Sequence, residues 1–274
     1  MKSIIENTLY YIEHHLDDEL NSHLLAQKAG YSTFHFSRAF KEIMGESLMS
    51  YVARLRLERS ARHVGLKETS MINVALDAGY KTPTGFLKAF KKQFTLTPTD
   101  YKEQSKQILH SDRSLVSINP VLVIKEPLSI VFVREYGGYE QSSKNAWERL
   151  YILFEKLENK LPQHLYNMQN SVLIGLCHDD PEITQADKIR YDAGMVFNQK
   201  EIAFFQSEGF STQEIAGGNY IKITHNGTFE ESDEVYRTLY AWIDEHNYVF
   251  RDEPSLEHYH NTLDMVDESH FITD

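Results

Sequence analysis

Two groups of basic, polar and aromatic residues have the types and the spacing needed to read DNA bases. The groups are Phe34, Ser37, Arg38 and Lys41, and then Thr84, Lys88 and Lys91. Within a group the residues stand three or four positions apart, which places them on one face of a helix. In a major groove Arg can donate two hydrogen bonds to a guanine edge, Ser and Thr can bond bases or phosphates, and an aromatic ring can contact a thymine methyl. Each group is therefore a candidate base-reading surface.

Both groups belong to an internal repeat. Ala29-Gly30-Tyr31 returns as Ala78-Gly79-Tyr80, 49 positions later, and with one residue inserted the match continues at an offset of 50. Each copy reads as a helix, a glycine turn and a second helix, which is the helix-turn-helix arrangement. Any single basic residue on such a face could simply be a solvated surface charge with no role in DNA binding. Two matching helices, with Arg38 and Lys88 in equivalent places, favour DNA binding instead.

The second helix of each copy also carries an apolar stripe that we expect to be buried. The stripes are Phe36, Ala39, Phe40, Ile43 and Met44, and then Phe86, Ala89, Phe90 and Phe94. Ser32 and Thr82 are the expected N-caps, and Pro83 suits a first helical turn. Between the copies, residues 50–64 should form a helix that carries Arg54, Arg56, Arg59 and Arg62. Such a helix could hold the two base-reading helices near the roughly 34 Å spacing of successive major-groove faces.

Further along the chain, Glu257 is the residue best suited to binding a ligand. Strand alternation places Ser255, Glu257 and Tyr259 on one face and Leu256 and His258 on the other. If Leu256 faces a helix layer, Glu257 points into a cleft beside an aromatic ring. A poorly hydrated carboxylate among aromatic rings attracts delocalised cations, whereas an exposed sheet carboxylate would have no such role. The candidate aromatic walls are Tyr139, Trp147, Tyr191 and Tyr220, although the helical spacing around Trp147 also fits ordinary core packing.

The elements of this rear region are doubled too. At an offset of 89, Gly138, Trp147 and Leu150 correspond to Gly227, Tyr236 and Leu239. The predicted order is a strand (128–136 or 220–225), a helix (142–159 or 230–247) and two more strands (172–177 and 190–196, or 256–260 and 269–273). Two α+β halves with their sheets side by side follow from this order. A cleft between such halves is a usual place for a small ligand.

The distribution of charge divides the chain near residue 110, between the helical repeat and the rear region. Of the 274 residues, 41% are hydrophobic and 25% are charged, and no apolar run is long enough to span a membrane. The one cysteine, Cys177, and the absence of a signal peptide favour the cytoplasm. Residues 1–110 contain 15 Lys and Arg against 12 Asp and Glu, whereas the rest contains 13 against 28. The predicted fold is an all-helical tandem helix-turn-helix domain (1–110), a linker (111–117) and a pseudo-symmetric α+β domain (118–274).

Few other patterns point to chemistry. No nucleotide-binding glycine loop, HExxH or GxSxG motif is present. His258 and His260 share one strand face and could bind a metal if a third ligand joined them. We nevertheless expect no metal, no cofactor and no catalytic residue.

The front domain resembles the DNA-binding domain of AraC-type transcription regulators over residues 20–102. The matching motifs are Ala26-Gln27-Lys28-Ala29-Gly30-Tyr31-Ser32, Phe36-Ser37-Arg38-Ala39-Phe40-Lys41, Ala75-Leu76-Asp77-Ala78-Gly79-Tyr80 and Phe86-Leu87-Lys88-Ala89-Phe90-Lys91. The resemblance implies that Phe34, Ser37 and Arg38 face bases in one groove, and Thr82, Thr84 and Lys88 in the next. Ser32, Thr33, Lys41 and Lys91 complete the expected DNA contacts. Pro83 stands where relatives often carry a polar contact residue.

The rear domain resembles the GyrI-like effector-binding domain of multidrug-response regulators over residues 117–274. The motifs are Glu135-Tyr136-Gly137-Gly138-Tyr139, Ile189-Arg190-Tyr191-Asp192-Ala193-Gly194 and Leu256-Glu257-His258-Tyr259. The resemblance implies that Glu257 sits in the ligand pocket and pairs with cationic ligands.

Together these features predict a ligand-responsive, sequence-specific transcription regulator that is not an enzyme. Its expected partners are double-stranded promoter DNA, a small amphipathic or cationic effector and RNA polymerase, with no membrane, and we expect a monomer. One alternative is a hydrolase of electrophilic small molecules in which Glu257 and Tyr259 activate water. Another is a protein that only sequesters a drug, which would leave the paired helices without a purpose.

Overall fold

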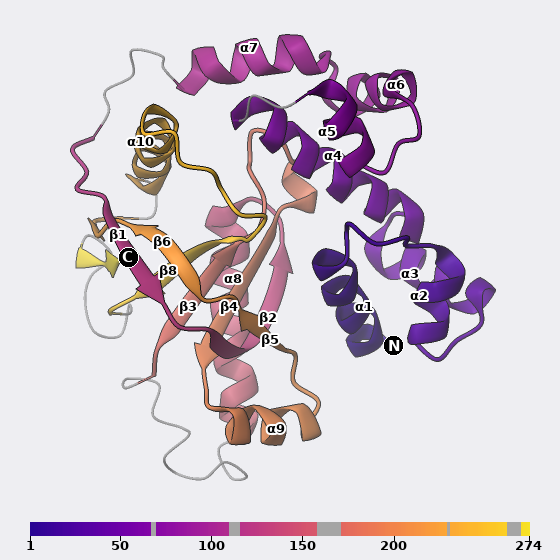
Figure 1. Ribbon diagram of the computed structural model, residues 1–274. Helices are drawn as coiled ribbons and strands as arrows, with labels where there is room; N and C mark the ends of the chain where they lie inside the picture. Colours follow the sequence, from indigo (N-terminus) through magenta and orange to yellow (C-terminus); the bar gives the residue numbers. More distant parts are fainter. Residues whose placement is uncertain (67–69, 110–115, 158–170, 229–230, 262–269) are drawn as a thin grey trace. The chain divides into compact units, whose positions relative to one another are not determined.

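The computed structural model of the chain describes residues 1–66, 70–109, 116–157, 171–228, 231–261 and 270–274 (Figure 1). Two compact units make up the chain, Met1–Ser111 and Asp112–Asp274. Most of the linker predicted over 111–117 lies outside the described residues. Among the helices that the structure does describe, none is long and apolar enough to cross a membrane.

The first unit is helical throughout its described part, as predicted. Its helices are α1 (Lys2–His14), α2 (Ser22–Lys28), α3 (Thr33–Met44), α4 (Leu48–Leu66), α5 (Met71–Asp77), α6 (Pro83–Phe94) and α7 (Pro98–Leu109). The sequence repeat corresponds to the pairs α2–α3 and α5–α6, with α4 between them (Figure 1). The tandem helix-turn-helix prediction is confirmed.

Both turns of the repeat have the same backbone geometry. Gly30 and Gly79 take φ angles of 76° and 81°, in the left-handed region that favours glycine. The next residue closes the turn in each copy: the Tyr31 amide donates to the Ala26 carbonyl at 3.0 Å, and the Tyr80 amide to the Ala75 carbonyl at 2.9 Å. The repeated Ala-Gly-Tyr sequence therefore encodes a helix C-terminus.

The caps and two phenylalanines of each stripe follow the sequence prediction, whereas Ala39, Met44, Ala89 and Phe94 are only half-buried. The Ser32 hydroxyl caps α3 and the Thr82 hydroxyl caps α6, each accepting a backbone N–H. Both pairs of stripe phenylalanines are fully buried: Phe36, Phe40, Phe86 and Phe90. The expected burial of Ile43 is wrong, because this side chain is 47% exposed. Periodicity gives the direction of a side chain, but not whether another element covers it.

The second unit is an α+β domain, again as predicted. Its strands are β1 (Val121–Lys125), β2 (Leu128–Tyr136), β3 (Leu173–Cys177), β4 (Arg190–Val196), β5 (Thr212–Ile215), β6 (Gly218–Lys222), β7 (His225–Asn226), β8 (Ser255–Tyr259) and β9 (Ile272–Thr273). Its helices are α8 (Tyr139–Leu157), the short 3-10 turn η3 (Ala186–Lys188), α9 (Gln199–Ser207) and α10 (Ser232–Glu245). The sequence did not reveal α9 and β5.

One seven-stranded sheet, in the order β5-β2-β4-β3-β8-β9-β7, joins the two halves. The halves meet where β3 pairs antiparallel with β8, and Gly175 stands opposite Glu257 in that pairing. The strand predicted over 220–225 is divided in the structure, because β6 pairs with β1 in a separate two-stranded sheet and β7 pairs with β9. Alternation indicates a strand without specifying its partner.

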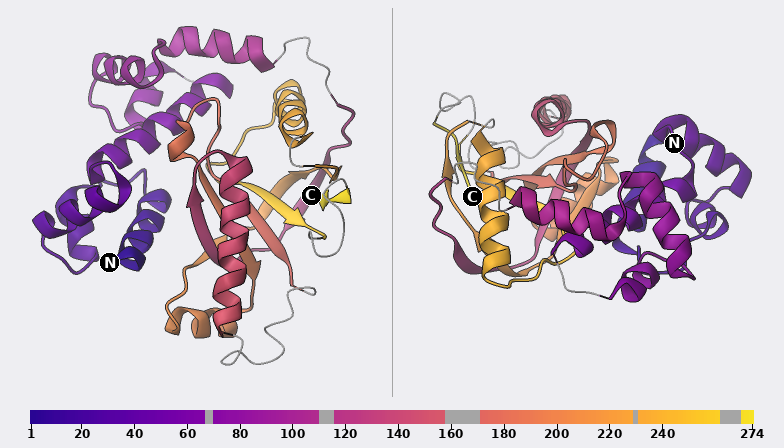
Figure 2. Two further views of the ribbon diagram at one scale, coloured as in Figure 1. Left: turned by 180° about the vertical axis from the view of Figure 1, so that it is seen from behind. Right: turned by 90° about the horizontal axis from the view of Figure 1, so that it is seen from above.

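Helix α8 covers one face of the large sheet, as Figure 2 shows. Its residues Ala146, Leu150 and Phe154 are fully buried against Tyr191 and Met195 of β4. This apolar cluster also takes in Tyr259 of β8. Burial of this face stabilises the unit and holds the centre of the sheet rigidly under the helix layer.

Candidate functional site

The predicted base-reading face of α3 is open to solvent. Phe34 is 73% exposed, a large value for an aromatic side chain, and the Arg38 side chain is 70% exposed. Lys41 and the capping Ser32 are exposed as well, whereas Thr33 and Ser37 are half-buried. Arg38 Nε lies 3.1 Å from Glu42 Oε1, and an ion pair this exposed contributes at most about 1 kcal/mol. Arg38 can therefore leave Glu42 for a base edge at little cost.

Helix α6 presents the equivalent face in the second copy. The predicted contacts Thr82, Thr84, Lys88 and Lys91 are all exposed. Thr82 uses its hydroxyl to cap the helix by accepting the Gly85 amide at 3.2 Å. Pro83 occupies the first turn, where no intrahelical N–H bond is lost.

The arginines of α4 have a structural role that the sequence did not reveal. Arg54 is buried and pairs with Glu46 at 2.9 Å and Glu58 at 3.1 Å. Arg59 Nη2 donates to Asp17 Oδ1, in the segment between α1 and α2, at 2.6 Å and to the carbonyl of Asp77, the last residue of α5, at 3.2 Å. These contacts tie α4 to the segment before the first copy and to the first helix of the second copy.

A cavity of about 660 Å³ lies in the second unit among α10, β1, β6 and β8. Its walls include apolar and aromatic side chains, among them Tyr220, Tyr236, Leu239, Tyr240 and Ile243. Glu257 also contributes to the wall. Glu253 and Asp274 line it as well. A mostly apolar cavity of this size with a few carboxylates suits a small organic ligand.

Tyrosine hydroxyls surround the Glu257 carboxylate. Tyr236 donates to Oε1 at 3.0 Å, and Tyr259 donates to Oε2. Behind Tyr259, the Tyr191 hydroxyl lies 2.8 Å away and receives the Trp147 indole N–H at 3.1 Å. Because an indole N–H can only donate, the hydrogen bonds run in one direction, from Trp147 through both tyrosines to Glu257.

Burial, hydrogen bonds and the nearby His225 set the electrostatics of this carboxylate. Burial raises the pKa of Glu257 above its ordinary value, while hydrogen bonds from Tyr259, Tyr236 and Cys177 act in the opposite direction. In the part of the chain that the structure describes, Glu257 forms no ion pair with Lys or Arg. A ligand cation could supply that missing charge, since opposite charge stabilises a desolvated carboxylate.

The condition that Leu256 faces the helix layer is not met in the structure. Leu256 packs with Ile174 and Leu176 on the other face. Glu257 and Tyr259 share the face covered by α8 and α10, where Tyr259 joins the α8 cluster. The strand alternation itself is as predicted, but alternation alone does not say which face a helix covers.

The other predicted effector residues divide into three sets. Tyr220 lines the cavity, where its hydroxyl donates to the Ala216 carbonyl at 2.6 Å. Tyr259 donates directly to Glu257, whereas Tyr191 and Trp147 reach the carboxylate only through Tyr259. The Tyr139 ring packs against the Tyr191 ring, with centroids 6.2 Å apart, and its hydroxyl donates to the Asp179 carbonyl at 2.5 Å.

Two residues that sequence reasoning missed shape this site. Tyr236 is the counterpart of Trp147 in the 89-residue repeat, so the repeat carried a signal that could have found it. Gly175 lies opposite Glu257, and a Cβ there would clash with the Tyr191 hydroxyl and stand 3.0 Å from Glu257 Oε2. Only glycine leaves the tyrosines room to reach the carboxylate.

Comparison with known families now agrees with this geometry. Residues 119–274 match the family described as "GyrI-like small molecule binding domain", and residues 25–104 match the family described as "Helix-turn-helix domain". The chain belongs to the GyrI-like family and carries an AraC-type DNA-binding domain.

Individual relatives share one or both units of this GyrI-like regulator. The transcriptional regulator Rob of Salmonella typhimurium is 25% identical over 87% of this chain and 83% of its own length. The regulatory protein SoxS of Escherichia coli is 31% identical over 38% of this chain and 96% of its own length. A crystal structure of the EcmrR C-terminal domain is 13% identical, covering 58% of this chain and 94% of that one, with a TM-score of 0.45. The GyrI-like regulator is thus a DNA-binding transcription regulator homologous to Rob and SoxS.

Proposed function

We propose that this GyrI-like regulator responds to a small amphipathic cation. The observation that carries the proposal is Glu257, a buried carboxylate on the wall of an aromatic cavity, held by tyrosine hydroxyls rather than by a cationic side chain. In this proposal residues 118–274 bind the effector, and residues 1–110 bind promoter DNA as a monomer and contact RNA polymerase. No catalytic step is needed for this role.

The effector site is tested with tetraphenylphosphonium, an aromatic cation, against triphenylphosphine oxide, a neutral aromatic of similar shape. Glu257→Gln should weaken binding of the cation by at least about tenfold, the equivalent of about 1.4 kcal/mol, because the ion pair is lost and the tyrosine donors remain. Binding of the neutral compound should change little. Isothermal titration calorimetry on the full chain measures both. An equal loss for the two compounds would mean that the variant disrupts the cavity in general.

The same site predicts a pH dependence. A cation gains from Glu257 only when the carboxylate is ionised, and burial raises the pKa of Glu257 above its ordinary value. Affinity for tetraphenylphosphonium should therefore rise as the pH climbs through the pKa of Glu257, and the Glu257→Gln variant should show a flat profile. A native profile as flat as that of the variant would speak against the ion pair.

For DNA we propose that α3 and α6 enter successive major grooves. The expected contacts are those presented on the two exposed faces, Ser32, Thr33, Phe34, Ser37, Arg38 and Lys41, and then Thr82, Thr84, Lys88 and Lys91. Selection of bound sequences from a random DNA pool by the full chain would first provide the operator.

On that operator, Arg38→Ala should weaken specific binding by about 1–3 kcal/mol, the range for a bidentate base contact. Glu42→Ala is the matched control, because it breaks the same exposed ion pair and leaves the guanidinium in place. Gel-shift titrations at fixed salt compare the two variants. If Arg38→Ala binds the operator as tightly as the native chain, Arg38 is not a base-reading residue.

A further inference from the structure

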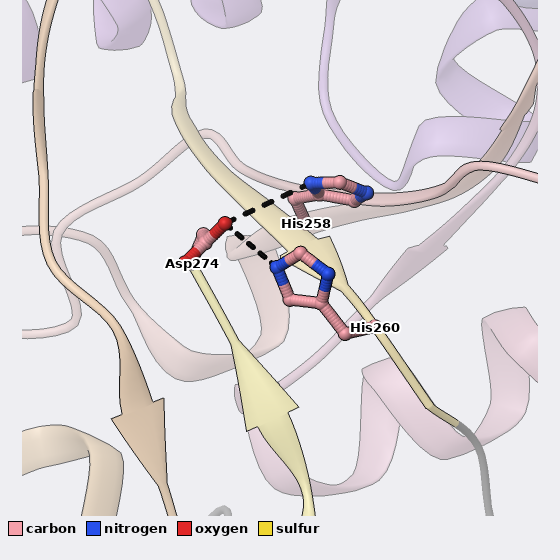
Figure 3. A group of neighbouring side chains, drawn as sticks. All are labelled: His258, His260 and Asp274. Atoms are coloured by element: carbon pink, nitrogen blue, oxygen red, sulfur yellow. Dashed lines mark hydrogen bonds and ion pairs between the residues drawn. The ribbon is translucent and has the colours of Figure 1, made fainter. Parts of the chain in front are cut away.

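The β8–β9 pair of the second unit brings three metal-ligating side chains together, and Figure 3 shows them. His258 lies in β8 and His260 directly after its end, with their ring centroids 4.4 Å apart, and Asp274 follows β9 on the neighbouring segment. Asp274 Oδ2 lies 2.7 Å from His260 Nε2 and 3.9 Å from His258 Nδ1. All three ligand atoms lie within 4.8 Å of one another.

Backbone pairing holds these ligands in place. His258 and Asp274 exchange both amide hydrogen bonds, each at 3.0 Å, so they stand directly opposite each other. The His260 amide donates to the Ile272 carbonyl at 2.9 Å and continues the pairing. Two adjacent segments of sheet thus orient the three side chains before any ion arrives.

Asp274 is also held by other polar side chains. Lys222 Nζ donates to its Oδ2 at 2.6 Å, and the Thr224 hydroxyl donates to its Oδ1 at 2.7 Å. A metal-ligating carboxylate usually has hydrogen-bonding partners of this kind.

We propose that His258, His260 and Asp274 form a binding site for a divalent transition-metal ion of the zinc type. Two imidazoles and one carboxylate match the ligands that Zn²⁺ takes, and three protein ligands leave coordination positions for water or a small molecule. An ion in this position links β8 to β9 through side chains as well as through the backbone. Asp274 also lines the cavity, so the ion would belong to the wall of that cavity.

Lys222 is the group that competes with the ion. Its Nζ lies 2.6 Å from Asp274 Oδ2, the same oxygen that approaches the two histidines. The Lys222 side chain is 32% exposed, so the ammonium group can turn toward solvent when a cation takes its place. Removing this charge should therefore strengthen metal binding.

The test is calorimetric titration of Zn²⁺ into the full chain after treatment with a chelator. The native chain should take up one ion, and His260→Gln, which alters a side chain that is 39% exposed, should weaken binding by more than about tenfold. Lys222→Met should strengthen it several-fold. His246→Gln is the matched control, since it replaces an exposed histidine at the end of α10.

A second measurement separates loss of the site from loss of the fold. Co²⁺ bound by the native chain should give visible absorption bands, and His260→Gln should abolish them while the circular dichroism spectrum stays unchanged. Absence of Zn²⁺ uptake by the native chain would overturn the proposal. It would be overturned equally if His260→Gln bound Zn²⁺ as tightly as the native chain does, or if His246→Gln weakened binding as much as His260→Gln.

Discussion

At the scale of single residues, Glu257 illustrates how tyrosine hydroxyls can satisfy a buried carboxylate that forms no ion pair with Lys or Arg in the described part of the chain. Two tyrosine hydroxyls donate to its oxygens, and the hydrogen bonds behind Tyr259 all point toward it. Donors to an anion partly replace the water that burial removes. The carboxylate is thereby ready for a ligand cation that would complete its charge balance.

Gly175 is the residue on which this arrangement depends sterically. We expect Gly175→Ala to push Tyr191 and Tyr259 away from Glu257, because the added methyl group meets both hydroxyls. The free energy of unfolding of the second unit should fall by about 1–3 kcal/mol, as for an overpacked core, and tetraphenylphosphonium should bind more weakly. Urea denaturation and calorimetry measure the two effects.

Gly138→Ala is the control for this substitution, because a methyl group there meets nothing within 4 Å. It should leave both the stability and the ligand affinity nearly unchanged. If Gly175→Ala behaved in the same way, the close packing around Glu257 would not matter for binding.

At the scale of elements, the two helix-turn-helix copies differ at the end of the second helix. Helix α3 ends on Gly45 with a φ of 72°, whereas α6 ends on Thr95 with a φ of 62°. A β-branched residue is strained in this left-handed region, and glycine is not. The second copy therefore carries a local strain that the first copy avoids.

Thr95→Gly should relieve that strain and raise the free energy of unfolding of the first unit by about 1 kcal/mol. The gain is limited by the greater backbone freedom of glycine in the unfolded chain. Gly45→Thr is the mirror experiment in the other copy and should lower the stability. Urea denaturation followed by helical circular dichroism compares the variants, and a loss of stability in Thr95→Gly would contradict the interpretation.

At the scale of the whole molecule, the proposed effector and the operator must affect each other reciprocally if the regulator responds to ligand. A ligand can shift a protein only by as much as its affinity differs between two states. If tetraphenylphosphonium changes the operator affinity by some factor, the operator must change the affinity for tetraphenylphosphonium by the same factor.

We expect that factor to lie between about 5 and 150, the usual range of allosteric coupling. Operator affinity is measured with and without saturating tetraphenylphosphonium, and ligand affinity with and without operator. Glu257→Gln should remove the coupling while leaving operator affinity without ligand unchanged. If the native chain binds the operator equally well with and without saturating tetraphenylphosphonium, the regulator does not respond through this cavity.

The sequence by itself determined the features that depend on local periodicity and repetition. The two copies of Ala-Gly-Tyr predicted both turns, and the caps Ser32 and Thr82 follow from preferences of residues at helix ends. The α+β character of the second unit and the alternation around Glu257 came from the same kind of signal. These features depend on residues that are only a few positions apart in the chain, so they can be inferred directly from the sequence.

Only the tertiary structure decided which distant residues meet. Tyr191 lies on β4 and Tyr236 on α10, and only the strand order and the helix packing bring Tyr236 to the Glu257 carboxylate and Tyr191 to Tyr259. The same holds for Asp274, which the pairing of β9 with β8 places beside His258. Strand pairing and side-chain packing join residues that are far apart in the sequence, so no local sequence pattern specifies these contacts.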